Sequence, residues 1–578
     1  MLSPATHPEA LAWRAATAPD RVAVRFRRDT GWEAWTTRQY AAAVGRQAQH
    51  LIDLGLRRGD RVGIVGATSP GWAVGALAVQ SAGGVVVSLY PSSAPAQVTR
   101  ALTAPPTRMV LVGSVPDEDG VAAAVDAVPG VAHVLALDPV GAVARPSGRW
   151  PVLGGPTAPD GEASRSDEDE AAFLAELTAR LDPDAPCTVI FTSGTTGDPK
   201  AAVHSFRSIA QIADSVAPAL GYREDDDYFV YLPLNHAAEQ SNTLVVGGHV
   251  GWTLNFGRSM DTIYDDLADV RPTVMFGVPR VFEKIGRDCL AAAGDGGDVA
   301  ATLRASGLDR LRVVLGGGAP MPAEVVDLFG RHGIAIRNGY GSTEGNGICM
   351  PWETAPRADT VGTPLPGVEV RLADDGEILV RSHGLCIGYL DADGGLRPLV
   401  DDDGFYHSGD VGELTADGQL RLVDRTRDII ITSGGKNVSP RQIEQALTAS
   451  PYLRAAMVVG NDRPYVGALV TPDVAAIRAS VGGNGVDGLD GFDGMGDDEL
   501  VGHPAVRALL DGVVADVNAG LSRPEQVKRW TVVSDGPAAA VAASAAAGMK
   551  VRRSDLHRAY RDDIDALYQE ALYPEAAQ

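Results

Sequence analysis

The residues with the clearest capacity for chemistry lie at 191–200 and read FTSGTTGDPK. They follow an apolar segment and combine glycines, hydroxyls and one lysine. Glycine lets backbone N–H groups point toward an anion, the hydroxyls add hydrogen-bond donors, and Lys200 adds a positive charge. The pattern differs from the G-x-x-x-x-G-K-[ST] loop, because only Gly194-Thr-Thr-Gly197 precedes Asp198-Pro-Lys200. The run therefore predicts a phosphate-binding loop of a different kind.

Further motifs rich in glycine or charged side chains follow along the chain. They are YLPLNHAAEQ (231–240), FGVPRVFEK (276–284), GGGAPM (316–321), GYGSTE (339–344), YHSGD (406–410) and VDRTRDIIITSGGKN (423–437). With the run at 191–200, this ordered set resembles the acyl-adenylate-forming (ANL) superfamily, which contains acyl-CoA synthetases, peptide-synthetase adenylation domains and luciferases. The motifs at 231–321 resemble its long-chain acyl-CoA synthetase branch. The resemblance extends from about residue 10 to about residue 570.

The resemblance implies an enzyme that activates a carboxylic acid with ATP. The acid attacks the α-phosphorus, and an acyl-adenylate and pyrophosphate form. Such a reaction needs cations and N–H groups directed at charge that develops on the phosphates. The resemblance assigns the β- and γ-phosphate contacts to Thr192, Ser193, Gly194, Thr195, Thr196, Gly197 and Lys200. It assigns the α-phosphate to Thr343 and a Mg²⁺ ion to Glu344 and Thr196.

The nucleoside contacts are implied in the same way. The residues expected to border adenine are Gly316, Gly317, Gly318, Ala319, Asn338, Gly339 and Tyr340. Asp410 is expected to accept hydrogen bonds from both ribose hydroxyls, with Arg425 nearby. Taken singly, these residues have simpler interpretations: 339–341 is an ordinary turn, Glu344 a solvated side chain and Asp410 a turn cap. The ordered set favours the nucleotide roles.

His236 and Glu239 are three residues apart, a spacing that suits two metal ligands on one helix face. No third ligand is evident, and the resemblance instead places His236 beside the acyl pocket. Glu239 stays open between a pocket wall and a helix surface. The stretches expected to form the acyl pocket are 236–242, 249–255 and 316–318, with 341–348 closing it. Asn346 and Gly347 depart from the Thr/Ser-rich texture common in the family after the glutamate, which favours a specialised acid.

A second domain is expected to begin at Arg427, the hinge that the resemblance implies, so that the domains span 1–426 and 427–578. In one pose Lys550 would bridge the carboxylate oxygen and the α-phosphate. In the other pose Gly435 and Lys436 would approach the site for thioester formation. Residues 537–547 are nearly all alanine, where the branch usually has a Leu-Thr-Pro-Thr-like run, so an exposed lysine near a helix start is the alternative for Lys550.

Alternating strand and helix patterns must position these motifs. Apolar segments at 61–66, 83–90, 109–112, 187–192, 228–232, 273–278 and 311–315 predict strands. The fold class is α/β: a large N-terminal domain of parallel-type sheets with helices. Short alternating segments at 361–424 predict a small antiparallel β-barrel within it. A small, mobile α+β C-terminal domain is expected to follow.

Composition limits the partners. The formal net charge is −24 and the pI near 4.8, which excludes broad binding of nucleic acid. Four cysteines without C-x-x-C spacing predict free thiols, and no signal peptide or membrane-length apolar run is evident, so a cytoplasmic enzyme is expected. The Gly/Asp-rich stretch 482–499 is interpreted as a solvated loop rather than a calcium site.

The sequence therefore predicts an ATP-dependent acid:CoA ligase that uses ATP, Mg²⁺ and CoA on a fatty or aromatic acid. The alternative keeps adenylation and omits CoA: the adenylate passes to an amine or a carrier protein, or nitrous acid is activated to diazotise an aryl amine. A non-catalytic nucleotide-binding regulator is disfavoured, because every expected charged catalytic position is filled.

Overall fold

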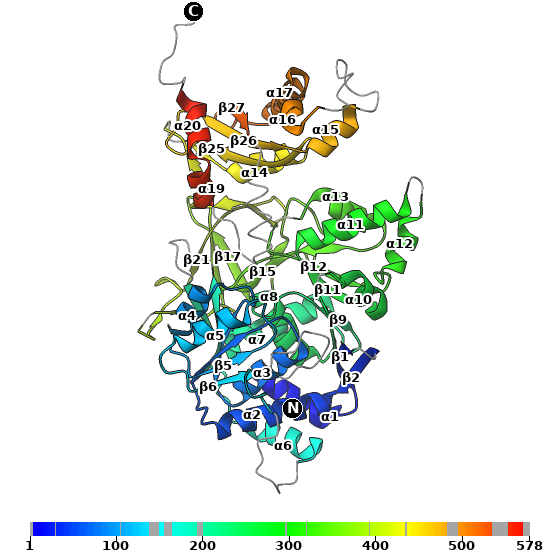
Figure 1. Cartoon of the computed structure of the whole chain (residues 1–578), viewed down its shortest axis with the longest axis vertical. Helices are drawn as coiled ribbons and strands as arrows, with labels where there is room; N and C mark the ends of the chain where they lie inside the picture. The colour runs from blue at the N-terminus through cyan, green and yellow to red at the C-terminus, as the bar shows by residue number, and fades with distance from the viewer. Residues whose placement is uncertain are drawn as a thin grey trace, which may run out of the picture. The chain divides into compact units, whose positions relative to one another are not determined.

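A computed structural model describes the chain as two compact units (Figure 1). The first unit comprises Met1–Arg371, Leu379–His407 and Leu414–Arg421, and the second Leu372–Ile378, Ser408–Glu413 and Leu422–Gln578. Within them the described residues are 4–28, 31–103, 106–137, 149–154, 165–192, 200–259, 261–294, 297–319, 321–391, 393–433, 436–481, 495–533 and 553–569.

An eight-stranded sheet forms one layer of the first unit. Its order is β20 (Leu396–Arg397), β19 (Gly388–Leu390), β8 (Lys200–Ser205), β7 (Pro186–Thr192), β4 (Val85–Leu89), β3 (Arg61–Val65), β5 (Met109–Val112) and β6 (His133–Ala136). The strands from β7 to β6 are parallel, as the alternating pattern predicts. Their residues are apolar and almost all buried, which is typical of parallel strands covered on both faces.

The other edge of this sheet differs from the predicted parallel type. Strand β8 is antiparallel to β7 and to β19, and β19 is antiparallel to β20. The reason is the length of the connection: residues 193–199 are too few for the crossover of about a dozen residues that a parallel return requires. The phosphate-loop run therefore connects two antiparallel neighbours.

A seven-stranded sheet forms the second layer of sheet structure in this unit. Its order is β13 (Ile336–Asn338), β12 (Val313–Gly316), β11 (Val274–Gly277), β9 (Asp227–Val230), β10 (Thr253–Phe256), β1 (Val22–Arg28) and β2 (Gly31–Thr36). All neighbours are parallel except β1 and β2. The carboxyl ends of β12 and β13 therefore lie at one edge, where ligands bind in sheets of this kind.

Helices cover these sheets (Figure 1). They are α1 (His7–Thr17), α2 (Thr37–Asp53), α3 (Pro70–Ser81), α4 (Pro95–Thr103), α5 (Glu118–Asp126), α6 (Asp167–Thr178), α7 (Phe206–Leu220), α8 (Ala237–Gln240), the π-helix η1 (Ser241–Val246), α9 (Gly247–Val250), α10 (Ile263–Val270), α11 (Pro279–Ala293), α12 (Val299–Ala305) and α13 (Ala323–Arg331). Helix α3 is buried along its whole length and lies in the largest hydrophobic core, with Trp72 fully enclosed. Its start is set by Ser69, whose hydroxyl accepts a hydrogen bond from the Trp72 amide.

A hairpin carries the GYGSTE motif. Strands β14 (Tyr340–Ser342) and β15 (Asn346–Met350) are antiparallel, and β16 (Thr363–Pro364) extends the sheet. The turn between them holds Thr343 and Glu344. A Cβ on Gly341 would lie 2.0 Å from the carbonyl oxygen of Asn346, so the tight crossing requires glycine there. Asn346 itself has a positive φ of 51°, a conformation that asparagine tolerates better than most residues.

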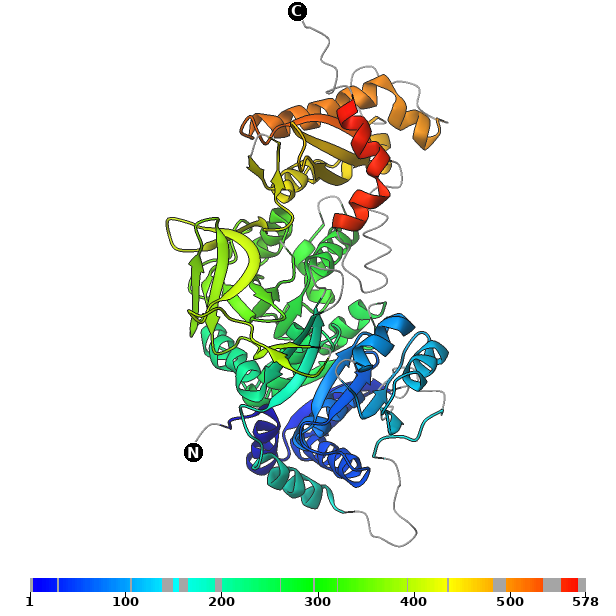
Figure 2. The same cartoon turned by 90° about the vertical axis from the view of Figure 1, so that its left-hand side faces the viewer.

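The second unit has its own α+β core. Its three-stranded sheet has the order β25 (Leu453–Val459), β26 (Val466–Pro472) and β27 (Val527–Val532). Its other elements are β23 (Ile430–Ile431), β24 (Asn437–Val438), α14 (Pro440–Thr448), α15 (Val474–Val481), α16 (Asp497–Gly502), α17 (Pro504–Ala519), α19 (Arg553–Ala559) and α20 (Arg561–Gln569). Figure 2 shows α20 in red beside this sheet, where Ile564, Leu567 and Tyr568 pack against β25 and β26.

A four-stranded sheet is divided between the units, since the boundary passes through all four of its strands. Its order is β17 (Val368–Leu372), β18 (Glu377–Ser382), β21 (Tyr406–Leu414) and β22 (Leu420–Arg425). The α/β fold class with additional small sheets is confirmed, and so are the free thiols: all four cysteines are buried and unpaired. Within the described residues, no helix is long and apolar enough to cross a membrane. Most of the Gly/Asp-rich stretch, 482–494, lies outside the described residues.

Candidate active site

Strand β8 has one apolar face and one face that carries chemistry. Alternation along a strand places Ala201 and Val203 on one side, where they pack with Val85, Val87 and Val189. Lys200 and His204 are on the opposite side. In the neighbouring strand Tyr389 pairs with Ala202, and paired residues in an antiparallel ladder share a face. We call this side, with Lys200, His204 and Tyr389, the β8 polar face.

Glu344 lies against the β8 polar face. The side chain is 8% exposed, and its Oε1 accepts a hydrogen bond of 2.8 Å from the Tyr389 hydroxyl. The backbone carbonyl of Glu344 accepts a further bond of 2.7 Å from the Cys386 amide. The Lys200 ammonium lies 4.9 Å from the centre of the Tyr389 ring. One aromatic ring thus contacts both the lysine predicted to bind phosphate and the carboxylate predicted to bind Mg²⁺.

Tyr389 acts in this cluster as a hydrogen-bond donor. Burial, and then the nearby Glu344 carboxylate, raise the pKa of the Tyr389 phenol well above its usual value. The phenol therefore keeps its proton at neutral pH. Tyr389 was not predicted from the sequence, because its pairing with β8 joins segments that are far apart along the chain.

His204 hydrogen-bonds to the backbone of Thr343, the residue before Glu344 in the turn. The ring is fully buried, and Nε2 lies 2.8 Å from the carbonyl oxygen of Thr343. Since a carbonyl only accepts, Nε2 carries the proton and donates. Burial lowers the pKa of His204 to about 4, so the ring is neutral at pH 7. His204 was not predicted from the sequence either, although the alternation from Lys200 to His204 indicates that both side chains occupy one strand face.

Of the residues predicted to contact phosphate, Thr192 and Lys200 are among the described residues. Thr192 ends β7 and pairs directly with Lys200 at the start of β8. The five residues Ser193, Gly194, Thr195, Thr196 and Gly197 lie outside the described residues. Of the two predicted Mg²⁺ ligands, Glu344 is therefore described and Thr196 is not. Within the described residues, no group of three or more His, Cys, Asp or Glu side chains forms a preformed metal site.

The predicted adenine residues converge at the ends of β12 and β13. Gly316 pairs with Asn338, and the Gly339 amide donates a hydrogen bond of 2.8 Å to the Gly316 carbonyl. Gly318 has a φ of +80°, a conformation that favours glycine. A Cβ on Gly316 would lie 2.7 Å from Cε of Met321, so the close packing against Met321 favours glycine there. The predicted run 317–319 and the residues Asn338 to Tyr340 are therefore neighbours.

Asn338 provides a test of whether this edge suits adenine. The side chain is 5% exposed, and its Oδ1 has no hydrogen-bond partner among the described residues. A buried acceptor without a donor is unfavourable unless a ligand satisfies it. The exocyclic amino group of adenine is a donor of the required kind. The residues present at this edge therefore fit a nucleotide base.

The predicted ribose residues belong to the second unit. Arg425 Nε lies 3.1 Å from Oδ1 of Asp410, so the two side chains form the expected neighbouring pair. The preceding Asp424 accepts hydrogen bonds from the Ser439 hydroxyl at 2.7 Å and from the Arg441 amide at 3.1 Å, which attaches β22 to the start of α14. Lys436 is exposed on the surface of this unit. Gly435 and Lys550 lie outside the described residues.

His236 and Glu239 have different surroundings. His236 caps helix α8: its Nδ1 accepts a hydrogen bond of 3.3 Å from the Ala238 amide, which leaves the proton on Nε2. The ring is exposed, yet the surrounding protein lowers its pKa by desolvation. Glu239 is fully buried, which excludes the helix-surface interpretation.

The buried Glu239 carboxyl belongs to a hydrogen-bonded group. Its Oε1 accepts a bond of 3.0 Å from the Thr243 hydroxyl, and its Oε2 one of 3.3 Å from the Tyr228 hydroxyl. Desolvation raises the pKa of Glu239 from 4.5 to about 8. The neighbouring Ser241 hydroxyl donates a bond of 3.3 Å to Asn346 Oδ1, which connects the π-helix η1 to the hairpin. π-helical turns are frequent at functional sites.

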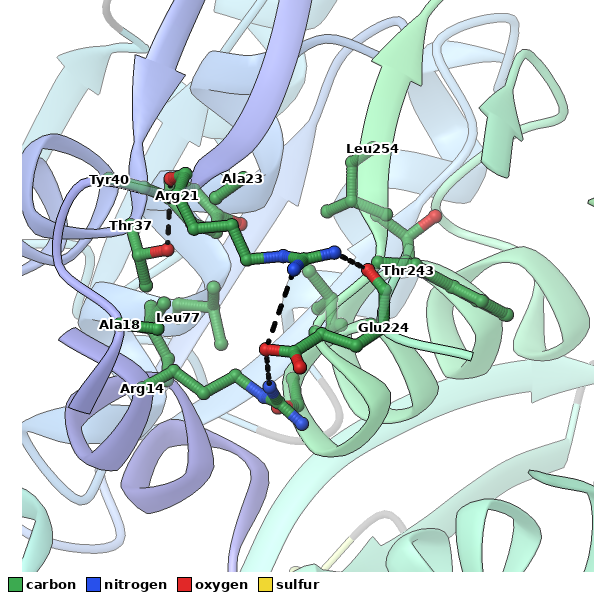
Figure 3. Close-up of a pocket in the computed structure, with 16 residues that line it drawn as sticks. Arg14, Ala18, Arg21, Ala23, Thr37, Tyr40, Leu77, Glu224, Thr243 and Leu254 are labelled. Atoms are coloured by element: carbon green, nitrogen blue, oxygen red, sulfur yellow. Dashed lines mark hydrogen bonds and ion pairs between the residues drawn. The ribbon is translucent and has the colours of Figure 1, made fainter. Parts of the chain in front are cut away.

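A small cavity lies at the far end of this helical segment (Figure 3). Arg14 and Arg21 both reach Glu224 at its mouth, with Nη1–Oε1 distances of 3.1 and 3.8 Å. Trp252 and Leu254, from the stretch predicted for the acyl pocket, are among its lining residues. Its volume of about 30 Å³ is enough for about two water molecules. This cavity therefore does not accommodate an acyl chain.

Lys200 on the β8 polar face and the Glu344 carboxylate both contact Tyr389, and the buried Oδ1 of Asn338 at the end of β13 has no partner among the described residues. These groups suit phosphate, Mg²⁺ and a nucleotide base. A family model described as AMP-binding enzyme matches residues 11–390, and one described as AMP-binding enzyme C-terminal domain matches residues 427–485. The chain belongs to the AMP-binding enzyme family of the ANL superfamily, and it is an adenylate-forming enzyme.

Relatives of known name confirm the predicted branch. The chain is 30% identical to the long-chain-fatty-acid–CoA ligase FadD15 of Mycobacterium bovis, over 95% of both chains. It is 27% identical to the long-chain-fatty-acid–CoA ligase ACSBG1 of Mus musculus, over 95% of this chain and 83% of the mouse protein. The solved anthranilate CoA ligase AuaEII, in complex with anthranoyl-AMP, has the same fold, with a TM-score of 0.73, 18% identity and coverage of 97% and 98%. So has the amide bond synthetase McbA of Marinactinospora thermotolerans, with a TM-score of 0.69, 24% identity and coverage of 92% and 96%.

The Glu239→Gln variant tests the buried carboxyl. The pKa of Glu239 in the folded chain, about 8, lies above its usual 4.5, so the folded state binds the proton more tightly. The stability that this proton confers is complete below about pH 4.5. This stability falls by about 1.4 kcal/mol per pH unit as the pH rises from about 4.5 toward 8. Glutamine stays neutral, so urea unfolding is expected to show a smaller loss of stability in the variant over this range.

The control for this measurement is Glu176→Gln, on the exposed surface of α6. This control should follow the wild-type pH dependence. Parallel curves for the wild type and Glu239→Gln between about pH 5 and pH 8 would contradict the raised pKa.

The Tyr389→Phe variant tests the bond to Glu344. It removes the hydroxyl that donates at 2.8 Å and keeps the ring beneath Lys200. A hydrogen bond to a charged group contributes about 1.5–3 kcal/mol, so urea unfolding should show a loss of that size. The matched control is Tyr231→Phe, because the buried Tyr231 hydroxyl has no partner among the described residues. Equal losses in the two variants would show that the Glu344 contact contributes nothing.

Proposed function

We propose that the chain joins a carboxylic acid to coenzyme A in two steps. In the first, a carboxylate oxygen attacks the α-phosphorus of ATP, the bond to the β-phosphate oxygen breaks, and pyrophosphate leaves. In the second, the CoA sulfur attacks the adenylate carbonyl, its proton is lost, and AMP leaves. The observation that carries the proposal is the contact of Tyr389 with both Lys200 and Glu344, within the stretch that the AMP-binding family model matches.

The roles proposed for the first unit follow from this cluster. Lys200 and Thr192 contact the leaving pyrophosphate, and Thr343 contacts the α-phosphate. Such donors lower the barrier when they are aimed in advance at developing charge. Glu344 is the residue that would hold Mg²⁺, which neutralises phosphate charge and prefers carboxylate oxygens. The bond from Tyr389 fixes the carboxylate of Glu344 in one orientation.

The nucleoside and acid contacts complete the proposed site. The unpartnered Oδ1 of Asn338 accepts from the adenine amino group, beside Gly317, Gly318, Ala319, Gly339 and Tyr340. In the second unit, Asp410 accepts from the ribose hydroxyls, with its partner Arg425 beside it. His236, which the resemblance places beside the acyl pocket, presents Nε2–H to the acid.

The acceptor is proposed from the relatives. FadD15 and ACSBG1 are both named as long-chain-fatty-acid–CoA ligases, and FadD15 matches over 95% of both chains. We therefore favour CoA over an amine or carrier protein, and a fatty acid over an aromatic one. The two poses expected about the Arg427 hinge would each serve one of the two steps. Lys550 serves adenylation, and Gly435 with Lys436 serves the thioester step.

A product assay tests the proposal. Fatty acids, aryl acids and nitrite are each supplied with ATP and Mg²⁺, with and without CoA and an amine. We expect AMP, pyrophosphate and an acyl thioester in equal amounts from a fatty acid when CoA is present. An amide formed without CoA, or AMP formed from nitrite with an aryl amine, would overturn CoA as the acceptor. ATP binding without pyrophosphate release from any acid would overturn adenylation itself.

Two lysine variants test the assignment of the half-reactions. Lys550→Ala is expected to slow adenylation by a factor of about 100 or more, the size seen when one donor to developing charge is removed, while ATP still binds. Lys436→Ala is expected to keep adenylation and to slow thioester formation from the adenylate. The control is Lys528→Ala, at an exposed position of β27. Full adenylation by Lys550→Ala would refute its role.

A further inference from the structure

We propose that His204 is a positioning residue for the adenylation step. Its Nε2–H holds the Thr343 carbonyl at 2.8 Å and thereby fixes the turn that carries the Thr343 hydroxyl and the Glu344 carboxylate. The inference rests on the proposed function, because it assumes that this turn faces the α-phosphate and the Mg²⁺ ion. His204 itself is fully buried and contacts the backbone, so it acts through the turn.

The turn is held from outside the hairpin by three hydrogen bonds. His204 donates to the Thr343 carbonyl, and the Cys386 amide donates to the Glu344 carbonyl at 2.7 Å. The Tyr389 hydroxyl donates to the Glu344 carboxylate at 2.8 Å. Two consecutive carbonyls and one side chain are thus fixed by β8 and the segment that includes β19. Within the turn, the Gly345 amide donates to the Ser342 hydroxyl at 3.0 Å. A turn with these constraints has little freedom to rotate its functional oxygens.

The orientation of the His204 ring is fixed in turn by the start of α7. Its Nδ1 lies 3.3 Å from the hydroxyl of Ser208. Ser208 and Ser205 form a reciprocal cap, in which each hydroxyl accepts a bond from the other residue's amide, at 3.0 and 3.1 Å. The helix start therefore determines the ring plane, and the ring plane determines where Nε2–H points. The neutral state of the ring leaves Nε2 as its one donor.

Strand β8 connects this bond to the phosphate lysine. Lys200 and His204 are four residues apart on one face, a separation of about 13 Å along an extended strand. The apolar face of the same strand is packed into a core with β4 and β7. The spacing between the Lys200 ammonium and the Thr343 turn is thus set by a buried, rigid element. Misplacement of reacting groups by about 1 Å can cost a factor of about 100 in rate.

The test compares His204→Leu with His204→Gln. Leucine removes the donor, and glutamine retains an N–H that can reach the Thr343 carbonyl. The control is His7→Leu: His7 is equally buried, and its ring bonds the Gln80 side chain at 2.9 Å instead of the Thr343–Glu344 turn. The readouts are kcat and KM for ATP in pyrophosphate release, the Mg²⁺ dependence of equilibrium ATP binding, and the melting temperature.

We expect His204→Leu to lower kcat by about 10–100-fold, with a smaller change in KM for ATP, and to require more Mg²⁺ for ATP binding. His204→Gln should recover at least about a third of the wild-type kcat. His7→Leu should lower the melting temperature and leave kcat and the Mg²⁺ dependence unchanged. The inference is overturned if folded His204→Leu matches the wild type, if both His204 variants are equally impaired, or if His7→Leu loses kcat to the same extent.

Two arms keep the test decisive. If His204→Leu does not fold, Ser208→Ala retains the histidine and frees its ring. A fall of a few-fold in kcat is then expected, and unchanged kcat overturns the inference. If the wild type releases no pyrophosphate with any acid, the proposed function fails. The Mg²⁺ dependence of ATP binding still tests His204 in that case, because it requires no acid substrate.

Discussion

The antiparallel placement of β8 between β7 and β19 is the constraint on which the site depends. The short connection 193–199 forces the chain to reverse direction, so the strand after the phosphate-loop run returns along β7. This return places Lys200 opposite Thr192 and brings His204 onto the same face as Lys200. β19 then adds Tyr389 opposite Ala202. Residues from three distant segments meet at the Thr343–Glu344 turn for this reason.

The two faces of β8 make different contributions: one packs into the hydrophobic core, and the other contacts the residues of the site. The apolar face joins a core with β4 and β7, which supplies the stability that fixes the strand. The opposite face receives a carboxylate that is almost entirely buried, and such a group is unfavourable unless it is hydrogen-bonded. The Tyr389 hydroxyl donates the hydrogen bond that the carboxylate needs, and it keeps its proton because its pKa is raised. The neutral His204 ring donates a hydrogen bond to the Thr343 carbonyl of the turn.

The strands that end in motifs were predictable, because short apolar runs stop at glycine or hydroxyl clusters. The ends of β7 and β12, with Thr192 and Gly316, are examples. The partner of β8 was not predictable, since strand pairing between distant segments leaves no local pattern. Tyr389 was missed for that reason. Glu239 stayed open because a carboxylate on a polar helix is usually exposed, and its burial depends on tertiary contacts with Tyr228 and Thr243. The roles of all the predicted site residues remain predictions, and Thr196, Gly435 and Lys550 lie outside the described residues.

The account depends most directly on the claim that an oxygen atom of the acid attacks the α-phosphorus. An acid labelled with ¹⁸O in its carboxyl group, turned over with ATP and CoA, tests this claim. Attack at the α-phosphorus followed by thiolysis leaves one labelled oxygen in each AMP, which mass spectrometry detects. We predict AMP that carries a single ¹⁸O. Unlabelled AMP, or label found in inorganic phosphate with release of ADP, would contradict the account.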